Sequence, residues 1–177
     1  MNNTVKGTIE SVDQMIDFIE TLDDSDYQFC AAPWLESSIG QHLRHIVDLF
    51  LALVNQEQDK AVDYEFRRRG ASIEISRTTG LLELRNVRAW MNQIESEDIE
   101  RPIRVLTEVS INSEQTEIFN STFGRELCFA SSHLTHHLAL MAVIAKIAGK
   151  SVDPTLGLAP ATATHVRNQL QDAACAP

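Results

Sequence analysis

The sequence has few cysteines, and they lie far apart. Three cysteines occur among the 177 residues, at Cys30, Cys128 and Cys175, and no two of them form a CxxC pair. This odd number and wide spacing argue against a disulfide framework and against a zinc site built from cysteines. We therefore expect reduced thiols, as in a cytoplasmic protein.

The sequence also lacks a long apolar run and an excess of basic residues. No continuous apolar stretch reaches the length of about 18 residues that spans a bilayer. The first residues, MNNTVKGTIESVDQ, lack the basic flank and apolar core of a signal peptide. The formal net charge is -10, which would repel phosphate groups. We expect a soluble cytoplasmic protein that binds neither nucleic acid nor membrane.

Several familiar catalytic motifs and any domain linker are absent. The sequence contains no Gly-rich phosphate loop, no GxSxG, no HExxH and no internal repeat. No segment rich in Gly, Pro or Ser divides the chain, whose length suits one domain. We expect a single domain over residues 1–177.

Four stretches have the apolar periodicity of amphipathic helices. They lie at residues 4–22, 39–54, 81–94 and 121–149. The acidic residues at 23–26 are expected to end the first of these helices. Each helix is long enough to cross a small domain, and together they suggest helices packed on helices.

The remaining segments connect these helices. Residues 55–79 are polar and form a long crossover, and residues 103–120 alternate in the manner of a short β-hairpin. A short end helix is expected near residues 163–173. The fold class is therefore mainly α, a four-helix bundle with a long crossover loop and a short β-hairpin before the last long helix.

The last long helix contains three of the six histidines. His133 and His137 lie four residues apart, so they project from one face, roughly 40° apart. Glu126 precedes His133 by seven residues and returns to within about 20° of the same direction. His136 lies to one side of this face, and Cys128 lies about 160° from Glu126, which we interpret as a core position. The spacing of His133 and His137 suits metal chelation.

A metal site needs a third ligand, and the second predicted helix offers two candidates. Ser38 precedes Gln41 by three residues, the spacing of a capping box that opens this helix. His42 and His45 follow, three residues apart. The apolar periodicity favours His42 as the more buried of the two, but the residues alone leave the choice between them open.

The segment DYEFRRRG places Arg67, Arg68 and Arg69 in the long polar crossover. One interpretation is a solvated surface or an ion-pair network. The other is a functional loop, since long loops often contribute to binding and catalysis.

At this point the sequence resembles the DinB-like (damage-inducible) superfamily, whose members are four-helix bundles that hold one divalent metal with three histidines. The resemblance rests on the runs IGQHLRHIVD and HLTHH, and the segments DYEFRRRG, STFGRELCF and LGLAPATAT add to it. It covers most of the chain. The family pattern implies His45, His133 and His137 as the metal ligands, and so selects His45 over His42.

The resemblance also implies a chemistry. Characterised relatives include thiol transferases and isomerases that use low-molecular-weight thiols, so metal-assisted thiol or hydrolytic chemistry on a small-molecule substrate is expected. Many relatives follow the last ligand with Arg-Gly-Gln, whereas here His137 is followed by Leu138-Ala139-Leu140. The resemblance therefore does not imply, for this chain, any substrate contact that relatives make at these three positions.

Three histidines with an open coordination position favour zinc or nickel over calcium or magnesium. His42 and His136 are expected to orient the site by hydrogen bonds without touching the ion. Glu126 is the candidate for a catalytic general base or a fourth ligand, and its alternative is an ion pair with an arginine. The alternative function is a non-catalytic, homo-oligomeric stress or binding protein with a structural metal. A homodimer is expected.

Overall fold

The computed structural model describes residues 2–57 and 59–174, so Cys175 lies outside the described residues. The described chain is mostly helical with a small sheet, which confirms the mainly-α prediction. Its elements are α1 (Asn3–Glu20), α2 (Asp24–Gln28), α3 (Ile39–Val54), β1 (Val62–Asp63), η1 (Ser72–Glu74), α4 (Arg77–Met91), η2 (Glu97–Glu100), β2 (Pro102–Glu108), β3 (Thr116–Thr122), α5 (Phe123–Ile147) and α6 (Pro160–Ala174).

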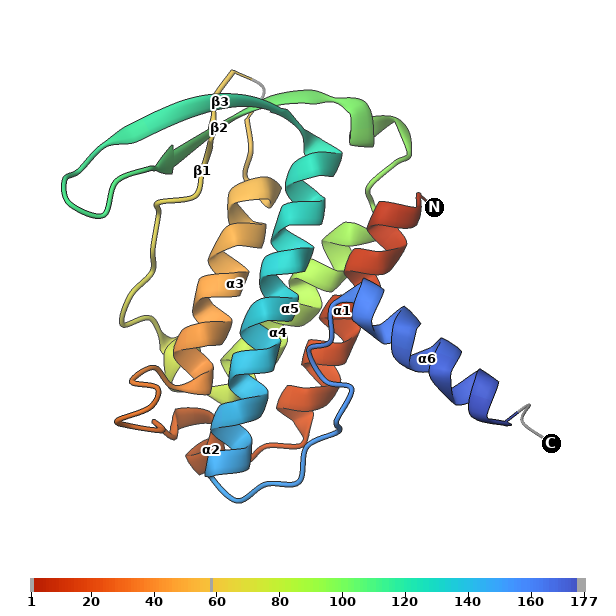
Figure 1. Ribbon diagram of the computed structural model, residues 1–177. Helices are drawn as coiled ribbons and strands as arrows, with labels where there is room; N and C mark the ends of the chain where they lie inside the picture. The colour runs from red at the N-terminus through yellow and green to blue at the C-terminus, as the bar shows by residue number, and fades with distance from the viewer. Residues whose placement is uncertain (1, 58, 175–177) are drawn as a thin grey trace.

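The long helices α1, α3, α4 and α5 pack against one another (Figure 1). α3 lies against α4 and α5, and α1 lies against the same two helices. α3 and α5 run in opposite directions (Figure 1). The side chains buried between these helices form one apolar cluster that includes Val12, Met15, Leu43, Phe50, Leu84 and Leu134.

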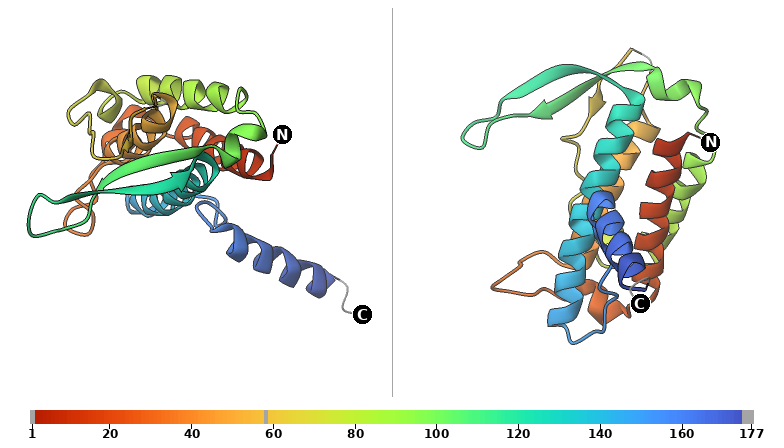
Figure 2. Two further views of the ribbon diagram at one scale, coloured as in Figure 1. Left: turned by 90° about the horizontal axis from the view of Figure 1, so that it is seen from above. Right: turned by 45° about the vertical axis from the view of Figure 1, so that its right-hand side comes forward.

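The predicted hairpin is present and lies across the end of the helices where α5 begins (Figures 1 and 2). β2 pairs antiparallel with β3, with Val105 opposite Phe119. β1 pairs parallel with β2, with Val62 also opposite Val105. β3 is therefore an edge strand, and it leads directly into α5.

Several helix boundaries differ from the sequence prediction, and the largest shift is in α4, which spans Arg77–Met91 instead of 81–94. α1 ends at Glu20, and the acidic residues that were expected to end it open the short helix α2. The Asp23 carboxylate accepts the Asp26 backbone N–H, and the Asp26 carboxylate accepts the Asp23 backbone N–H. This reciprocal capping box explains why acids that were expected only to stop one helix start another.

The chain after α5 folds back before it leaves the core. Gly157 has a positive φ of 74°, and its backbone packs against Ala139 of α5 closely enough that a Cβ would clash there. α6 then projects away from the other helices (Figures 1 and 2). The predicted end helix is confirmed, with a start three residues earlier than expected.

Within the part of the chain that the structure describes, α5 is the one helix long and apolar enough to cross a membrane by length and composition. Its most apolar 18-residue window has a mean hydropathy of 1.4, although charged and polar residues interrupt the run in sequence. α5 packs against both α1 and α3, as a core helix of a soluble protein does. A single such helix is therefore weak evidence for a membrane span.

Candidate metal centre

The start of α3 fixes the position of its two histidines. The Ser38 hydroxyl accepts the Gln41 backbone N–H, and the Gln41 side chain accepts the Ser38 backbone N–H, so the predicted capping box is present. His42 and His45 follow within the first two turns, and both are half-buried. Because the cap fixes where the helix begins, it also fixes the face on which these imidazoles lie.

α5 provides the other two histidines of the group. Thr122 caps this helix by accepting the Arg125 backbone N–H, and the helix continues without interruption through His133 and His137. Because α3 and α5 are antiparallel, the histidine order is reversed between them. His45 therefore lies beside His133, and His42 lies beside His137.

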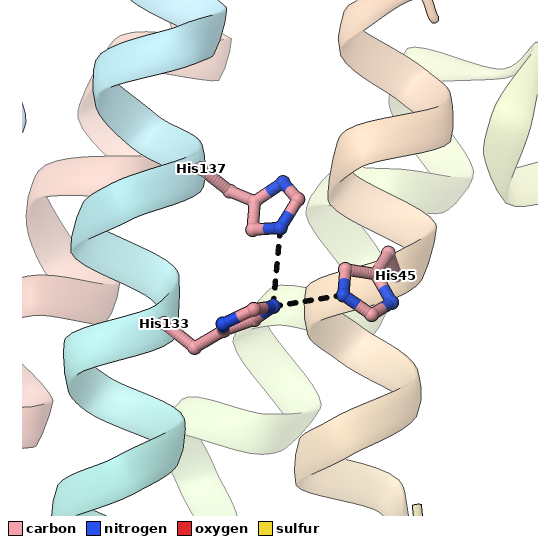
Figure 3. Close-up of side chains that lie close together, drawn as sticks. All are labelled: His45, His133 and His137. Carbon is pink, nitrogen blue, oxygen red and sulfur yellow. Dashed lines mark hydrogen bonds between the residues drawn. The ribbon is translucent and has the colours of Figure 1, made fainter. Parts of the chain in front are cut away.

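Three Nε2 atoms converge between the two helices (Figure 3). His45 Nε2 lies 2.8 Å from His133 Nε2, and His133 Nε2 lies 3.1 Å from His137 Nε2. The ligand atoms of all three side chains lie within 4.8 Å of one another. The three histidines named from the sequence are therefore brought together, and they could hold a metal ion.

The spacing of these nitrogens fits a single ion. Two ligands of a tetrahedral zinc ion, with bonds of about 2.05 Å, lie roughly 3.3 Å apart. The two measured separations, 2.8 and 3.1 Å, are close to this value. Three neutral imidazoles that all present Nε2 lone pairs to one point repel one another unless a cation or a proton lies between them. The arrangement therefore suits a bound cation.

His42 contacts the group from outside. Its Nδ1 atom lies 2.8 Å from Nδ1 of His137. If His137 offers its Nε2 lone pair, its proton is at Nδ1 and is donated to Nδ1 of His42. The proton of neutral His42 is then at Nε2, an atom that is buried and has no hydrogen-bond partner among the described residues. His42 thus occupies the orienting position that metal-ligating histidines commonly have beside them.

Burial keeps these histidines neutral. It lowers the pKa of His45 to about 4, with the nearby charge of Arg67 as the next cause, and it lowers the pKa of His137 to about 3. Burial also lowers the pKa of His42 and His133. Imidazoles with pKa values below the ordinary one are unprotonated at neutral pH, which is the form that binds a metal.

A cavity of about 520 Å³ opens beside the histidines. On the other side of the group, the Phe129 ring stacks on His133, with ring centroids 5.7 Å apart and planes 29° from parallel. The aromatic ring limits motion of His133, while the cavity leaves room for a small molecule. The residues that line the cavity are Ser37, Gln41, His42, Arg44, His45, Arg69, Gly70, Glu74 and His137.

Comparisons with known proteins do not assign the chain to a family. A search against protein-family profiles finds no match. The chain is similar to FK506-binding protein 5 of Rhizopus delemar, with 27% identity over 108 residues. That segment covers 61% of this chain and 28% of the relative, so the chain spans well under a third of the relative's length.

Glu126 lies apart from the group of three histidines. Its carboxylate is buried and accepts hydrogen bonds from the Tyr64 hydroxyl at 3.0 Å and the Ser121 hydroxyl at 2.6 Å. It lines a separate cavity of about 380 Å³ together with Phe129. Among the described residues it makes none of the ion pairs with arginine that were considered as its alternative. Its role as a base stays a prediction.

The prediction that Cys128 lies in the core is wrong, because Cys128 is exposed. Cys128 and Glu126 lie on nearly opposite sides of α5, and the side that faces inward is the one with Glu126. His136 lies beside the group, with its ring 5.3 Å from that of His137 and 6.1 Å from that of His133, but it is exposed and forms none of the expected orienting hydrogen bonds among the described residues.

An ion-pair network was one interpretation of the three arginines, and Arg68 forms one, but its acidic partners were not predicted from the sequence. Arg44 contacts Asp48 at 3.3 Å and Glu74 at 2.9 Å, and Arg68 contacts Asp48 at 2.6 Å. The Asp48 side chain is fully buried. The spacing of four between Arg44 and Asp48 was a signal for the first pair, but the contact with Arg68 depends on how the long crossover folds.

Of Leu138, Ala139 and Leu140, which follow His137, the first two have packing contacts. Leu138 is fully buried, and Ala139 lies against Gly157. None of the three lines the cavity beside the histidines.

Proposed function

We propose that this protein binds one divalent metal ion through His45, His133 and His137. The observation that supports this most is the convergence of three Nε2 atoms from α3 and α5. His42 holds His137 in the tautomer that leaves Nε2 free. The Phe129 ring stacks on the ring of His133 and limits its motion.

Zinc or nickel is the ion that this donor set favours. Imidazole suits borderline ions, whereas calcium and magnesium prefer oxygen ligands. The group of three contains no carboxylate. Such an ion supplies Lewis acidity, which lowers the pKa of a water or thiol toward neutrality. Three protein ligands leave at least one coordination position for that molecule.

We further propose a DinB-like four-helix bundle, formed by α1, α3, α4 and α5 in one domain. It is supported by the closed ring of neighbours, in which each of these helices packs against two others. The two described cysteines are free and exposed, which supports a reducing, cytoplasmic location. No property of FK506-binding protein 5 is transferred to this chain, because the match covers 28% of that protein.

The proposed activity is a metal-dependent thiol transfer or hydrolysis on a small molecule, with a low-molecular-weight thiol as one candidate substrate. The cavity beside the histidines is within the range of small-molecule sites, which starts at about 300 Å³. His45 and His137 reach this cavity directly. Glu126 remains the proposed base, although it lines the separate cavity at Tyr64 and Ser121 and not the cavity beside the histidines.

A screen of the metal-loaded protein against thiol conjugation and ester or amide hydrolysis tests this activity. The His133→Ala variant should lose both the metal and the activity, whereas Glu126→Gln should keep the metal and lose about 100-fold or more in rate. A chelator should lower the melting temperature of the wild type, because an ion bound only to the native state stabilises it. Activity that persists in His133→Ala would contradict the enzyme proposal.

The second candidate is a non-catalytic homo-oligomer in which the metal is structural. It is favoured by the edge strand β3, where Ile118 is 53% exposed and Phe119 is 51% exposed. An edge strand with few charges can pair with a second copy of the chain. A stable homodimer that binds the metal but is inactive throughout the screen would support this candidate over the enzyme.

A further inference from the structure

The three consecutive arginines of the long crossover have different contacts. Arg68 pairs with Asp48 of α3 at 2.6 Å and with Glu83 of α4 at 2.8 Å. Its backbone N–H also donates to the Asp48 carboxylate at 3.1 Å. These contacts fasten the crossover to two helices, so the residues on either side of Arg68 are held close to the histidines.

Arg67 lies on one side of this anchor, next to the metal ligands. Its guanidinium donates to the carbonyl oxygens of Tyr64 and Phe66, and it forms no ion pair among the described residues. Its guanidinium is near enough to His45 and His133 for its charge to act on both imidazoles. Arg67 thus adds positive charge beside the ligands.

Arg69 lies on the other side of the anchor and lines the cavity next to His42, His45 and His137. It is exposed. Within the described part of the chain, its guanidinium has neither a hydrogen bond nor an ion pair. The other two charged residues that line the cavity, Arg44 and Glu74, are paired with each other at 2.9 Å. Among the described residues that line the cavity, Arg69 is therefore the positively charged side chain that is free to bind a ligand.

The charge balance of the cavity favours an anion. Three neutral histidines leave the full charge of a divalent ion uncompensated, and the group contains no carboxylate. Around the group, four arginines (Arg44, Arg67, Arg68 and Arg69) balance four carboxylates (Asp48, Glu65, Glu74 and Glu83), so the charge of the ion is the net positive charge that remains. The N-terminus of α3 contributes less, because its capping box occupies two of its groups.

We propose that the substrate carries a carboxylate, which Arg69 binds at the mouth of the cavity while the reacting group lies at the three histidines. A guanidinium binds a carboxylate through two parallel hydrogen bonds, which fixes the orientation of the molecule as well as its affinity. A singly charged carboxylate also matches the single guanidinium of Arg69, since the other charged residues lining the cavity, Arg44 and Glu74, pair with each other. This assignment rests on the proposed function.

The test uses a rigid pair of thiols, 4-mercaptobenzoate and the neutral 4-mercaptobenzamide. The ring prevents the carboxylate from reaching an ion that holds the sulfur of the same molecule. Each thiol is titrated into cobalt-loaded protein, and the thiolate-to-metal absorption band reports binding. The wild type should bind the benzoate roughly tenfold more tightly than the benzamide, the expected gain from a hydrogen bond to a charged group.

In Arg69→Gln this preference should disappear, with about equal affinities for the two thiols, while the affinities for cobalt and for the benzamide stay unchanged. Arg167→Gln, on the projecting helix α6, makes the same change in net charge and should keep the preference. A wild type that binds both thiols equally, or an Arg167→Gln variant that loses as much as Arg69→Gln, would overturn the assignment. If the protein binds no cobalt, the metal site and this inference both fail. If it binds cobalt but does not prefer the benzoate, only this inference fails.

Discussion

Replacement of His45 with alanine is expected to abolish metal binding, whereas replacement of His42 is expected only to weaken it. His45 provides one of three converging Nε2 atoms, and no other described histidine lies where it could substitute. His42 contacts His137 through Nδ1 and is not part of the group. Loss of such an orienting partner typically costs 10- to 100-fold in affinity.

An isothermal titration of zinc into metal-free protein distinguishes the two variants. The wild type and His42→Ala should both saturate at one ion per chain, with a dissociation constant roughly 10- to 100-fold higher for His42→Ala. His165→Ala, on α6, is the matched control and should titrate like the wild type. Tight binding by His45→Ala combined with none by His42→Ala would reverse the assignment of the ligand on α3.

Replacement of Asp48 with asparagine is expected to cost about 3–5 kcal/mol in the free energy of unfolding, the usual result when one partner of a buried ion pair is removed. The fully buried Asp48 carboxylate accepts from the side chains of Arg44 and Arg68 and from the backbone N–H of Arg68. The neutral amide leaves two guanidinium groups without their shared counter-charge. It also releases the anchor that holds Arg67 and Arg69 beside the histidines.

Urea unfolding of the metal-free protein, followed by circular dichroism, measures this loss. Glu20→Gln is the matched control, because Glu20 pairs with Arg85 at 2.6 Å but both side chains are about half exposed. That pair should contribute less than about 1 kcal/mol. An Asp48→Asn variant as stable as Glu20→Gln would show that the buried pairs do not hold the crossover in place.

The histidine pair on α5 could be predicted from the sequence because its geometry is local. A spacing of four residues on a helix places His133 and His137 on one face whatever the rest of the chain does. The choice between His42 and His45 could not be made locally, since it depends on which helix packs against α3 and in which direction. The antiparallel packing of α5 gives both residues a partner, with His45 beside His133 and His42 beside His137.

The long crossover was the least predictable part of the chain. β1 contains two residues and is a strand only because β2 lies beside it, so no periodicity could reveal it. The hydrogen bond from Tyr64 to Glu126 joins residues 62 positions apart. Glu126 lies seven residues before His133 on the continuous helix α5, roughly 10 Å along the axis, so it lines a separate cavity although the two share a helical direction. The core position predicted for Cys128 was wrong for a related reason, because helical direction shows opposite sides but not which one faces inward.

X-ray absorption spectroscopy of the zinc-loaded protein, purified without a histidine tag, tests the central claim most directly. Elemental analysis of the same sample should find about one zinc per chain. The absorption fine structure should show three imidazole nitrogens at roughly 2.0–2.1 Å and one further light ligand. His45→Ala should not retain this signal. A protein that takes up no zinc, or whose zinc is bound by sulfur or by fewer than three imidazoles, would contradict the three-histidine site.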